Sequence, residues 1–280
     1  MPYRLLALDI DGTVLNSKVE LTSPTSNAIS ALLQEGWMVT LVSGRRHLGM
    51  VDIARQLQVN APIIAFNGGM IFDPYTYDIL DLKTLKLPVI KDLLLCLFAS
   101  GLTVRIYSGS FDGPQYVYYG ENFITNLPPN PAEVIDPSLI PQRIYSFEEL
   151  SFEPLRILIG GSEEETTRAK SLAAPWMTGC GIWAMHSYDY DGMWYLEFFP
   201  DGSDKAVGLS TLCTLLNISL SEVVAVGDNS NDIEMVREAG LGVAMGNAVP
   251  ELKEVADMVI GHHDEDGLAA FIETLMKKVD

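Results

Sequence analysis

The hydrophobic positions in the first part of the chain alternate between the spacing of buried strands and that of amphipathic helices. The apolar run at 4–8 ends in acidic residues and Gly12. In the next segment Ser23 is the expected N-cap of a helix, Pro24 its first-turn proline and Gly36 its stop signal. We expect strands at 4–8, 37–42 and 62–66 and helices at 23–36 and 47–58. This order predicts a parallel sheet with right-handed crossovers.

The middle of the chain, from about residue 83 to residue 201, has a different pattern. It is rich in tyrosine, contains proline-rich turns such as 128–131, and carries a capping-box signal at Ser162 and Glu165. We expect strands at 155–159, 183–186 and 194–198 and a helix at 162–173. We interpret this segment as an inserted α+β domain rich in antiparallel strands.

The first pattern resumes after residue 202. We expect helices at 203–216, after Ser230 and ending at Leu275, and strands at 223–226 and 242–244. The predicted fold class is therefore α/β. Residues 1–82 and 202–280 would form a doubly wound, Rossmann-like core with a parallel sheet, and residues 83–201 would form the inserted α+β domain.

The charge of the chain restricts its partners. The 280 residues include 18 Lys and Arg against 37 Asp and Glu, which gives a formal net charge of −19. A field of this sign repels nucleic acids and anionic membranes, so we expect neither as a partner. A small anionic substrate would need a local cation or a metal ion at its site. The sequence leaves open whether the protein is a monomer or a homodimer.

The cysteines and the apolar runs indicate where in the cell the protein is expected. Cys96, Cys180 and Cys213 are widely spaced and form no C-x-x-C pair, which favours three reduced thiols over disulfides or a zinc site. The apolar run before Asp9 is too short for the core of a signal peptide. The longest apolar-rich stretch, 93–104, falls short of the ~20 residues that span a bilayer. We expect a soluble, cytoplasmic protein.

Four short segments fall at or just after predicted strand ends, where doubly wound folds bind their ligands. The candidate segments are Asp-Ile-Asp-Gly-Thr at 9–13, Ser-Gly-Arg at 43–45, Lys205, and Gly-Asp-Asn-Ser-Asn-Asp at 227–232. Each alone has an ordinary structural explanation: an acidic turn, a helix N-cap, a surface lysine or an asparagine-rich turn.

Together, the four segments indicate phosphoryl transfer. Asp9, Asp11, Asp228 and Asp232 in one crevice would repel one another strongly unless a divalent cation lay among them. Mg²⁺ suits oxygen ligands together with a phosphate. Lys205 and Ser43 could then neutralise or hydrogen-bond the remaining phosphoryl oxygens.

The order and content of these segments resemble the haloacid dehalogenase-like (HAD) superfamily, and most closely its Cof-type phosphatases. The shared motifs are Asp-x-Asp-Gly-Thr, Ser-Gly-Arg, Asn-Gly, the lysine and Gly-Asp-x-x-Asn-Asp. The resemblance covers the whole chain, with the insert in the place of a mobile cap domain. Two positions depart from the pattern, Gly69 where alanine is common and Ala206 where glycine is usual.

The resemblance implies a Mg²⁺-dependent phosphatase that acts through an aspartyl-phosphate on Asp9, with Asp11 as general acid and base. It also implies hinges near Leu82 and Pro200. The implied metal-site residues are Asp9, Asp11 through its backbone carbonyl, Asp228 and Asp232, the last orienting the metal's waters or Lys205. The implied phosphate-binding residues are Ile10, Ser43, Gly44, Lys205 and Asn231, of which Ser43 and Lys205 also count as catalytic.

Several alternatives stay open at this point. A sugar phosphomutase of the same superfamily would use the same Asp-x-Asp-Gly-Thr chemistry, and a non-catalytic protein could sense a phosphorylated metabolite. The substrate could be a sugar phosphate or a phosphorylated cofactor. The aromatic residues and arginines of the insert either build its core or face the substrate. His186, His262 and His263 lie outside the four segments and receive no role.

Overall fold

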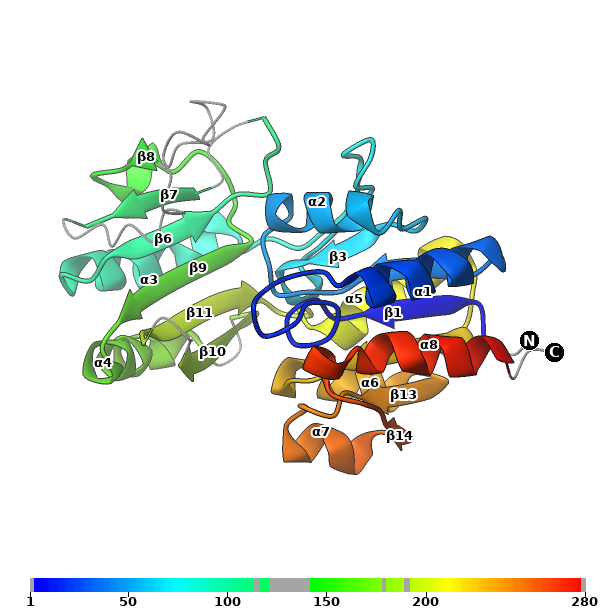
Figure 1. Cartoon of the computed structure of the whole chain (residues 1–280). Coiled ribbons are helices and arrows are strands. Elements are labelled where there is room, and N and C mark those ends of the chain that lie inside the picture. Colours follow the sequence, from blue (N-terminus) through cyan, green and yellow to red (C-terminus); the bar gives the residue numbers. More distant parts are fainter. Residues whose placement is uncertain (1–2, 113–115, 121–141, 178–179, 189–191, 278–280) are drawn as a thin grey trace. The chain divides into compact units, whose positions relative to one another are not determined.

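The computed structural model describes residues 3–112, 116–120, 142–177, 180–188 and 192–277 (Figure 1). The chain divides into two compact units. One comprises Met1–Asp81 with Gly202–Asp280, and the other comprises Leu82–Asp201.

The first unit is built on a parallel sheet with the strand order β14-β13-β12-β1-β2. The strands are β1 (Leu5–Leu8), β2 (Met38–Leu41), β12 (Val223–Gly227), β13 (Leu241–Ala244) and β14 (Met258–Val259). Every residue of β1 and β12 is buried, as expected for central parallel strands covered on both faces. Beside β2 lies β3 (Ile63–Ala65), which pairs antiparallel with β4 (Met70–Phe72), and β4 in turn neighbours β5 (Ile79–Leu82).

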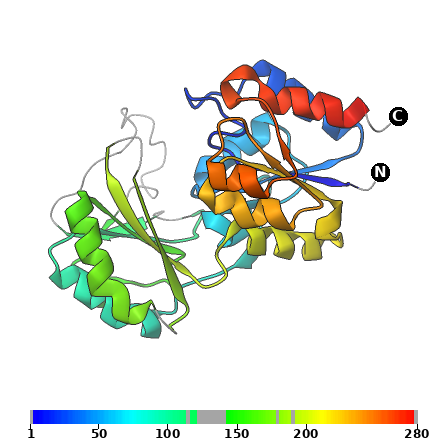
Figure 2. The ribbon, with the colours of Figure 1, turned by 90° about the horizontal axis from the view of Figure 1, so that it is seen from below.

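Helices cover both faces of this sheet. The helices are α1 (Ser23–Gln34), α2 (Leu48–Gln56), α5 (Lys205–Leu216), α6 (Ile233–Glu238), α7 (Pro250–Val255) and α8 (Gly267–Lys277). Helices α1 and α8 pack together on one face, while α5 and α6 pack together on the other (Figure 2). The α/β fold class expected from the sequence is confirmed, and the carboxyl ends of β1 and β12 meet at one edge.

The second unit is a six-stranded sheet with the order β10-β11-β9-β6-β7-β8. Its strands are β6 (Val104–Tyr107), β7 (Tyr116–Tyr119), β8 (Gln142–Arg143), β9 (Arg156–Gly161), β10 (Ile182–Tyr188) and β11 (Trp194–Pro200). All described pairings are antiparallel except β7 with β8. Helices α3 (Leu87–Ala99) and α4 (Glu163–Ala173) pack on it, and the predicted capping box at Ser162 and Glu165 opens α4.

The structure also departs from the sequence-based expectations. Helix α1 is capped by Thr22, whose side chain accepts a hydrogen bond from the Thr25 backbone, so Ser23 is the first helical residue and not the cap. The expectations did not include α3, whose high overall hydrophobicity hides its helical period, or the six-residue helix α7. The turn predicted at 128–131 lies outside the described residues.

Several aromatic residues and arginines of the insert have structural contacts. Arg156 is buried, pairs with Glu197 at 3.0 Å, and lies 4.2 Å from the centroid of the Tyr107 ring. Trp183 stacks on Phe199, with 4.7 Å between the ring centroids. These side chains brace the sheet of the insert.

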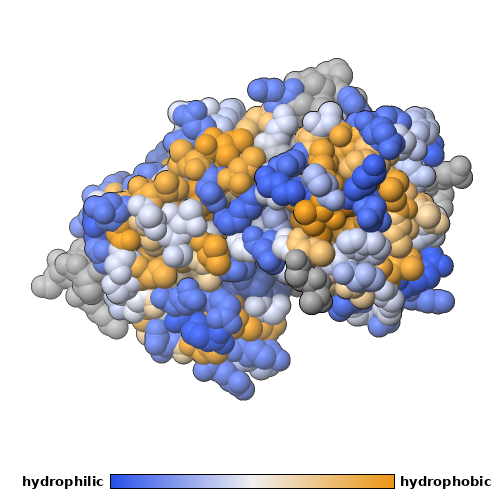
Figure 3. All heavy atoms as spheres, turned by 180° about the vertical axis from the view of Figure 1, so that it is seen from behind, coloured by the Kyte–Doolittle hydropathy of each residue, from blue (hydrophilic) through white to orange (hydrophobic). Residues whose placement is uncertain are grey.

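The surface is mixed in character. On the face drawn in Figure 3, hydrophobic and hydrophilic residues are interspersed. Exposed apolar side chains, among them Leu215 and Val259, occur in the chain as in most globular proteins. Within the described part of the chain, none of the helices combines the length and the apolar character that crossing a bilayer requires.

The buried ion pair of the insert yields a stability prediction. Glu197→Ala should lower the free energy of unfolding by about 3–5 kcal/mol, because the Arg156 guanidinium would stay buried without its carboxylate partner. Urea unfolding followed by circular dichroism measures the change. Glu153→Ala is the matched control, since Glu153 pairs with Lys86 on the surface and its loss should matter far less. Equal losses in the two variants would contradict this assignment.

Candidate active site

Asp9 follows β1 directly, at the carboxyl edge of the sheet. Its backbone N–H donates to the Val226 carbonyl at 3.0 Å, which continues the pairing of β1 with β12 by one residue. The Asp9 side chain is only 6% exposed, and its Oδ1 accepts a hydrogen bond from Lys205 Nζ at 2.6 Å. The sheet therefore fixes the backbone of Asp9, and Lys205 fixes one of its carboxylate oxygens.

Lys205 begins α5, which is capped by the side chain of Asp204. Its Nζ lies 2.6 Å from Asp9 Oδ1 and 2.5 Å from Asp232 Oδ1, and its side chain is 1% exposed. Burial lowers the pKa of Lys205, but the carboxylates of Asp232 and Asp9 outweigh this and raise the pKa above its ordinary value. The side chain is therefore a buried ammonium ion.

The start of α5 packs closely against the segment after β3, and this contact depends on a glycine. Gly68 has φ +93°, and a Cβ at this position would overlap the carbonyl oxygen of Asp204, the cap of α5. Only glycine allows this backbone conformation and this close contact together. The Asn-Gly segment after β3 thus helps to place Lys205.

Asp232 is fully buried, and both of its carboxylate oxygens are engaged. Oδ1 accepts from Lys205, while Oδ2 accepts the backbone N–H groups of Asp228 and Asn229, each at 3.0 Å. Such bonds hold the 227–232 turn in a fixed shape. The geometry favours Asp232 as the residue that orients Lys205.

Asp228 lies at the end of β12, facing the loop that follows Asp9. Its Oδ1 accepts from the Thr13 hydroxyl at 3.3 Å, and its Oδ2 accepts from Asn247 Nδ2 at 3.3 Å. Gly12 has φ +78°, and a Cβ there would overlap Asp228 Oδ2. The glycine of Asp-x-Asp-Gly-Thr is therefore needed for the two acidic segments to approach each other.

The carboxylates of Asp9, Asp228 and Asp232 form one cluster, with one oxygen of each lying within 4.8 Å of the others. Burial raises the pKa of Asp9 well above its usual value, and the charges of Asp232 and Asp228 add to this, while Lys205 opposes it. Burial, together with the charge of Asp232, raises the pKa of Asp228 to about 6. One ammonium group does not neutralise three carboxylates, and all the potential metal ligands are oxygen atoms. The cluster therefore fits a hard divalent cation.

The side chain of Asp11 is directed toward Arg45 and does not join this cluster. Arg45 donates to both Asp11 oxygens, at 2.8 Å from Nε and 2.6 Å from a terminal nitrogen. Such a bidentate pair fixes the plane of the carboxylate. The Asp11 side chain is 56% exposed, so it remains accessible.

The segments expected to bind phosphate lie close to one another. Ser43 is buried, its Oγ accepts from the Arg45 backbone at 3.2 Å, and its carbonyl accepts from the Asn67 backbone at 3.0 Å. Asn231 Nδ2 donates to Asn67 Oδ1 at 3.0 Å. A Cβ on Gly44 would lie 3.0 Å from the same Asn67 oxygen. Asn67 therefore links the segments that contain Ser43, Gly44 and Asn231.

Sequence reasoning did not assign individual roles to Thr13, Arg45, Asn67 and Asn247. The first three lie within quoted motifs, so their places in those motifs were a usable signal. Asn247 lies in no quoted motif, yet its Nδ2 donates to the Gly12 carbonyl at 2.8 Å as well as to Asp228. Nothing in the local sequence distinguishes it from an ordinary turn residue.

Comparison with known proteins identifies the family to which the chain belongs. The family model for haloacid dehalogenase-like hydrolases matches residues 6–272, so the chain belongs to that family. It is 27% identical over 274 residues to the 5-amino-6-(5-phospho-D-ribitylamino)uracil phosphatase YitU of Bacillus subtilis, covering 97% of each chain. It is also 27% identical to the pyridoxal phosphate phosphatase YbhA of Escherichia coli, covering 97% of this chain and 98% of that one.

A solved structure of the same family is also similar to this chain. A haloacid dehalogenase-like hydrolase from Bacteroides thetaiotaomicron superposes with a TM-score of 0.79 at 29% identity, covering 98% of this chain and 99% of that chain. The resemblance to Cof-type HAD phosphatases is confirmed, and so is the enzyme class of hydrolases that act on phosphate esters.

Asn247 yields a prediction about the carboxylate cluster. Asn247→Ala should weaken the binding of a divalent cation to the cluster about 10- to 100-fold, because the amide that orients Asp228 and holds the Gly12 carbonyl would be lost. Titration calorimetry with Mg²⁺ measures the affinity. Asn60→Ala is the control, because the Asn60 amide bonds the Trp37 and Val39 backbone and should affect stability alone. A Mg²⁺ affinity equal to that of the wild type would refute the positioning role of Asn247.

Proposed function

We propose that this protein is a Mg²⁺-dependent phosphatase that hydrolyses the phosphoric monoester of a small metabolite through an aspartyl-phosphate on Asp9. One observation carries the proposal: Lys205 Nζ bridges Asp9 and Asp232, with Asp228 in the same cluster, at the ends of adjacent parallel strands. A carboxylate held in this way can serve as a nucleophile. Two named relatives are phosphatases of small phosphorylated metabolites.

In the first step, a carboxylate oxygen of Asp9 would attack phosphorus while the bond from phosphorus to the leaving oxygen breaks. Lys205 holds Oδ1 of Asp9, so the carboxylate cannot rotate away from the substrate. Asp11 would give its proton to the leaving oxygen. In this structure Arg45 holds the Asp11 carboxylate, so Asp11 would leave Arg45 when it takes up the proton that it gives to the leaving oxygen.

In the second step, water would attack the phosphorus of the aspartyl-phosphate and release Asp9 and inorganic phosphate. Asp11, having lost its proton in the first step, would accept one from this water. The proton balance then closes over the cycle. No other base is required among the residues assigned to the site.

The cation would be held by Asp9, Asp228 and the backbone carbonyl of Asp11. When bound, Mg²⁺ supplies positive charge that offsets the carboxylates and the phosphoryl oxygens. Asp232 would act through Lys205, because both of its oxygens are already engaged. This assignment keeps Asp232 in the site but outside the direct ligands.

The phosphoryl oxygens would be bound by Ser43, Gly44, Lys205 and Asn231. Ile10 has a fully buried side chain, so it could contribute only through its backbone. We assign substrate choice to the insert of residues 83–201, acting as a cap. Suitable substrates are sugar phosphates and phosphorylated cofactors. The cytoplasmic location stays a prediction.

The nucleophile assignment predicts the effect of one substitution. Asp9→Asn should lower kcat by about a thousandfold or more, because an amide oxygen is a poor nucleophile toward phosphorus. Phosphate release from a panel of sugar phosphates and phosphorylated cofactors measures the rate, with Asp52→Asn on the exposed face of α2 as the control. Retention of more than a few per cent of the wild-type rate would exclude Asp9 as the nucleophile. Sugar-phosphate isomers without released phosphate would indicate a mutase instead.

The metal assignment predicts dependence on an added cation. Removal of divalent ions with a chelator should reduce phosphate release to background, and Mg²⁺ should restore it. Ca²⁺ should restore less activity, because it takes longer bonds and more ligands than a site suited to Mg²⁺ offers. A full rate in the presence of excess chelator would overturn the role given to the carboxylate cluster.

A further inference from the structure

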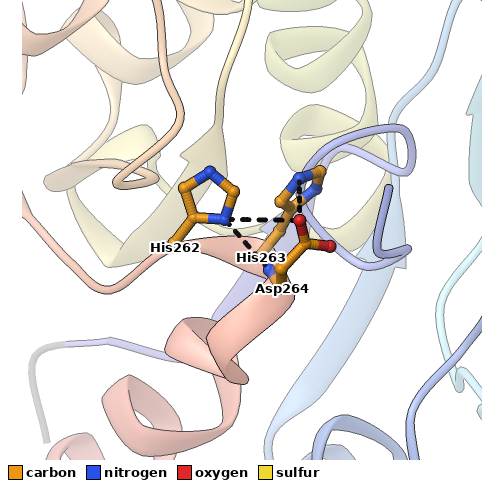
Figure 4. A group of neighbouring side chains, drawn as sticks. All are labelled: His262, His263 and Asp264. Atoms are coloured by element: carbon orange, nitrogen blue, oxygen red, sulfur yellow. Dashed lines mark hydrogen bonds and ion pairs between the residues drawn. The ribbon is translucent and has the colours of Figure 1, made fainter. Parts of the chain in front are cut away.

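A second group of potential metal ligands lies in the turn between β14 and α8. Figure 4 shows His262, His263 and Asp264 with their polar atoms directed toward one another. Asp264 Oδ2 lies 3.8 Å from His262 Nδ1 and 3.7 Å from His263 Nε2. The side chains are 41%, 13% and 42% exposed, respectively, so solvent and small ions can reach them.

These distances are too long for direct hydrogen bonds between the rings and the carboxylate. They are close to the separation that a shared metal ion would impose. Two ligand atoms bound tetrahedrally at about 2.1 Å from zinc lie about 3.4 Å apart. Each observed nitrogen–oxygen distance exceeds this by only a few tenths of an ångström. The third pair of ligand atoms, the two nitrogens, also lies within 4.8 Å, so binding would need rotations of the side chains that bring the three atoms closer.

Neighbouring hydrogen bonds fix which atoms face the centre of this group. His263 Nδ1 lies 3.1 Å from the Leu15 carbonyl, which can only accept, so Nδ1 carries the proton. Nε2 is therefore the ring nitrogen of His263 that is directed toward Asp264 and could bind a metal ion. Asp264 Oδ1 accepts from the Ser17 backbone at 2.8 Å, which holds Oδ2 toward the rings. Protein metal sites orient their histidine and carboxylate ligands with outer bonds of this kind.

His262 Nδ1 is an acceptor as well. It accepts a hydrogen bond from the Asp264 backbone N–H at 3.2 Å, which occupies its lone pair in this structure. To bind a metal ion, Nδ1 would exchange this hydrogen bond for a bond to the ion. The two histidine nitrogens and the Asp264 oxygen all lie within 4.8 Å of one another. Three acceptors this close repel one another unless a proton or a metal ion lies between them.

We propose that His262, His263 and Asp264 form a second metal site that binds a borderline transition-metal dication such as Zn²⁺. Imidazole nitrogen selects such ions over Mg²⁺, which prefers the oxygen-only cluster of Asp9, Asp228 and Asp232. The two sites therefore take different ions. The proposal is independent of the phosphatase assignment, because it concerns binding alone.

The second site is connected to the loop that follows Asp9. His263 and Asp264 hold the backbone at Leu15 and Ser17, respectively. The His263 backbone N–H also donates to Asn247 Oδ1 at 3.1 Å, and Asn247 in turn holds Gly12 and Asp228. A metal ion bound to His263 and Asp264 would stiffen this loop.

Calorimetric titration with Zn²⁺ in excess Mg²⁺ tests the site, because excess Mg²⁺ would compete for the oxygen-only carboxylate cluster. We expect one Zn²⁺ to bind and His263→Gln to weaken its binding at least about tenfold. His186→Gln is the matched control, since His186 Nε2 bonds the Thr166 hydroxyl in the other unit and should not affect Zn²⁺ affinity. Asp228→Asn, which disables the carboxylate cluster, should also leave Zn²⁺ affinity unchanged.

A spectroscopic probe provides a second, independent readout. Co²⁺ in place of Zn²⁺ should give ligand-field absorption bands in the wild type that are lost in His262→Gln and Asp264→Asn and kept in His186→Gln. Far-UV circular dichroism checks that each variant is folded. The proposal fails if Zn²⁺ shows no saturable binding in excess Mg²⁺. It also fails if binding depends on Asp228 and not on His263.

Discussion

The structure of the site depends on one buried ammonium ion. Lys205 Nζ touches Asp9 and Asp232, and its side chain is almost fully excluded from solvent. A buried charge is costly unless it is paired, so the lysine and its two carboxylates require one another. This constraint makes the start of α5, the end of β1 and the turn after β12 a single unit. The remaining negative charge of Asp228 and its neighbours then creates the preference for a divalent cation.

The parallel sheet makes this arrangement possible. Residues far apart in the sequence reach one edge because β1 and β12 pair in parallel register, and both strands end there. The insert enters after β5 and leaves before α5, so it does not interrupt the pairing of the central strands. It has a hydrophobic core of its own, formed between its sheet and the helices α3 and α4. Its surface can therefore vary without cost to the carboxylate cluster.

The sequence predicted those parts of the protein that local patterns specify. The central strands, the capping box at Ser162 and the convergence of Asp9, Lys205 and Asp228 followed from apolar runs, cap residues and strand ends. Other features depend on contacts between distant segments. Arg45 lies in a quoted motif, but its pair with Asp11 forms only when two distant strand ends meet. The Asn247 bridge to Asp228 joins residues whose neighbours in sequence give no sign of it. The expected N-cap at Ser23 was wrong because Thr22 offers an equivalent hydroxyl one residue earlier.

The loop after Asp9 shows how the two groups of potential ligands are related. On one side, Asp228 binds the Thr13 hydroxyl and Asn247 binds the Gly12 carbonyl. On the other side, His263 and Asp264 hold the backbone further along the same loop. The potential metal ligands are oxygen atoms in one group and mainly imidazole nitrogens in the other, so the two groups suit different metal ions. A single loop therefore lies between a cluster suited to phosphoryl transfer and a cluster suited to a structural metal ion.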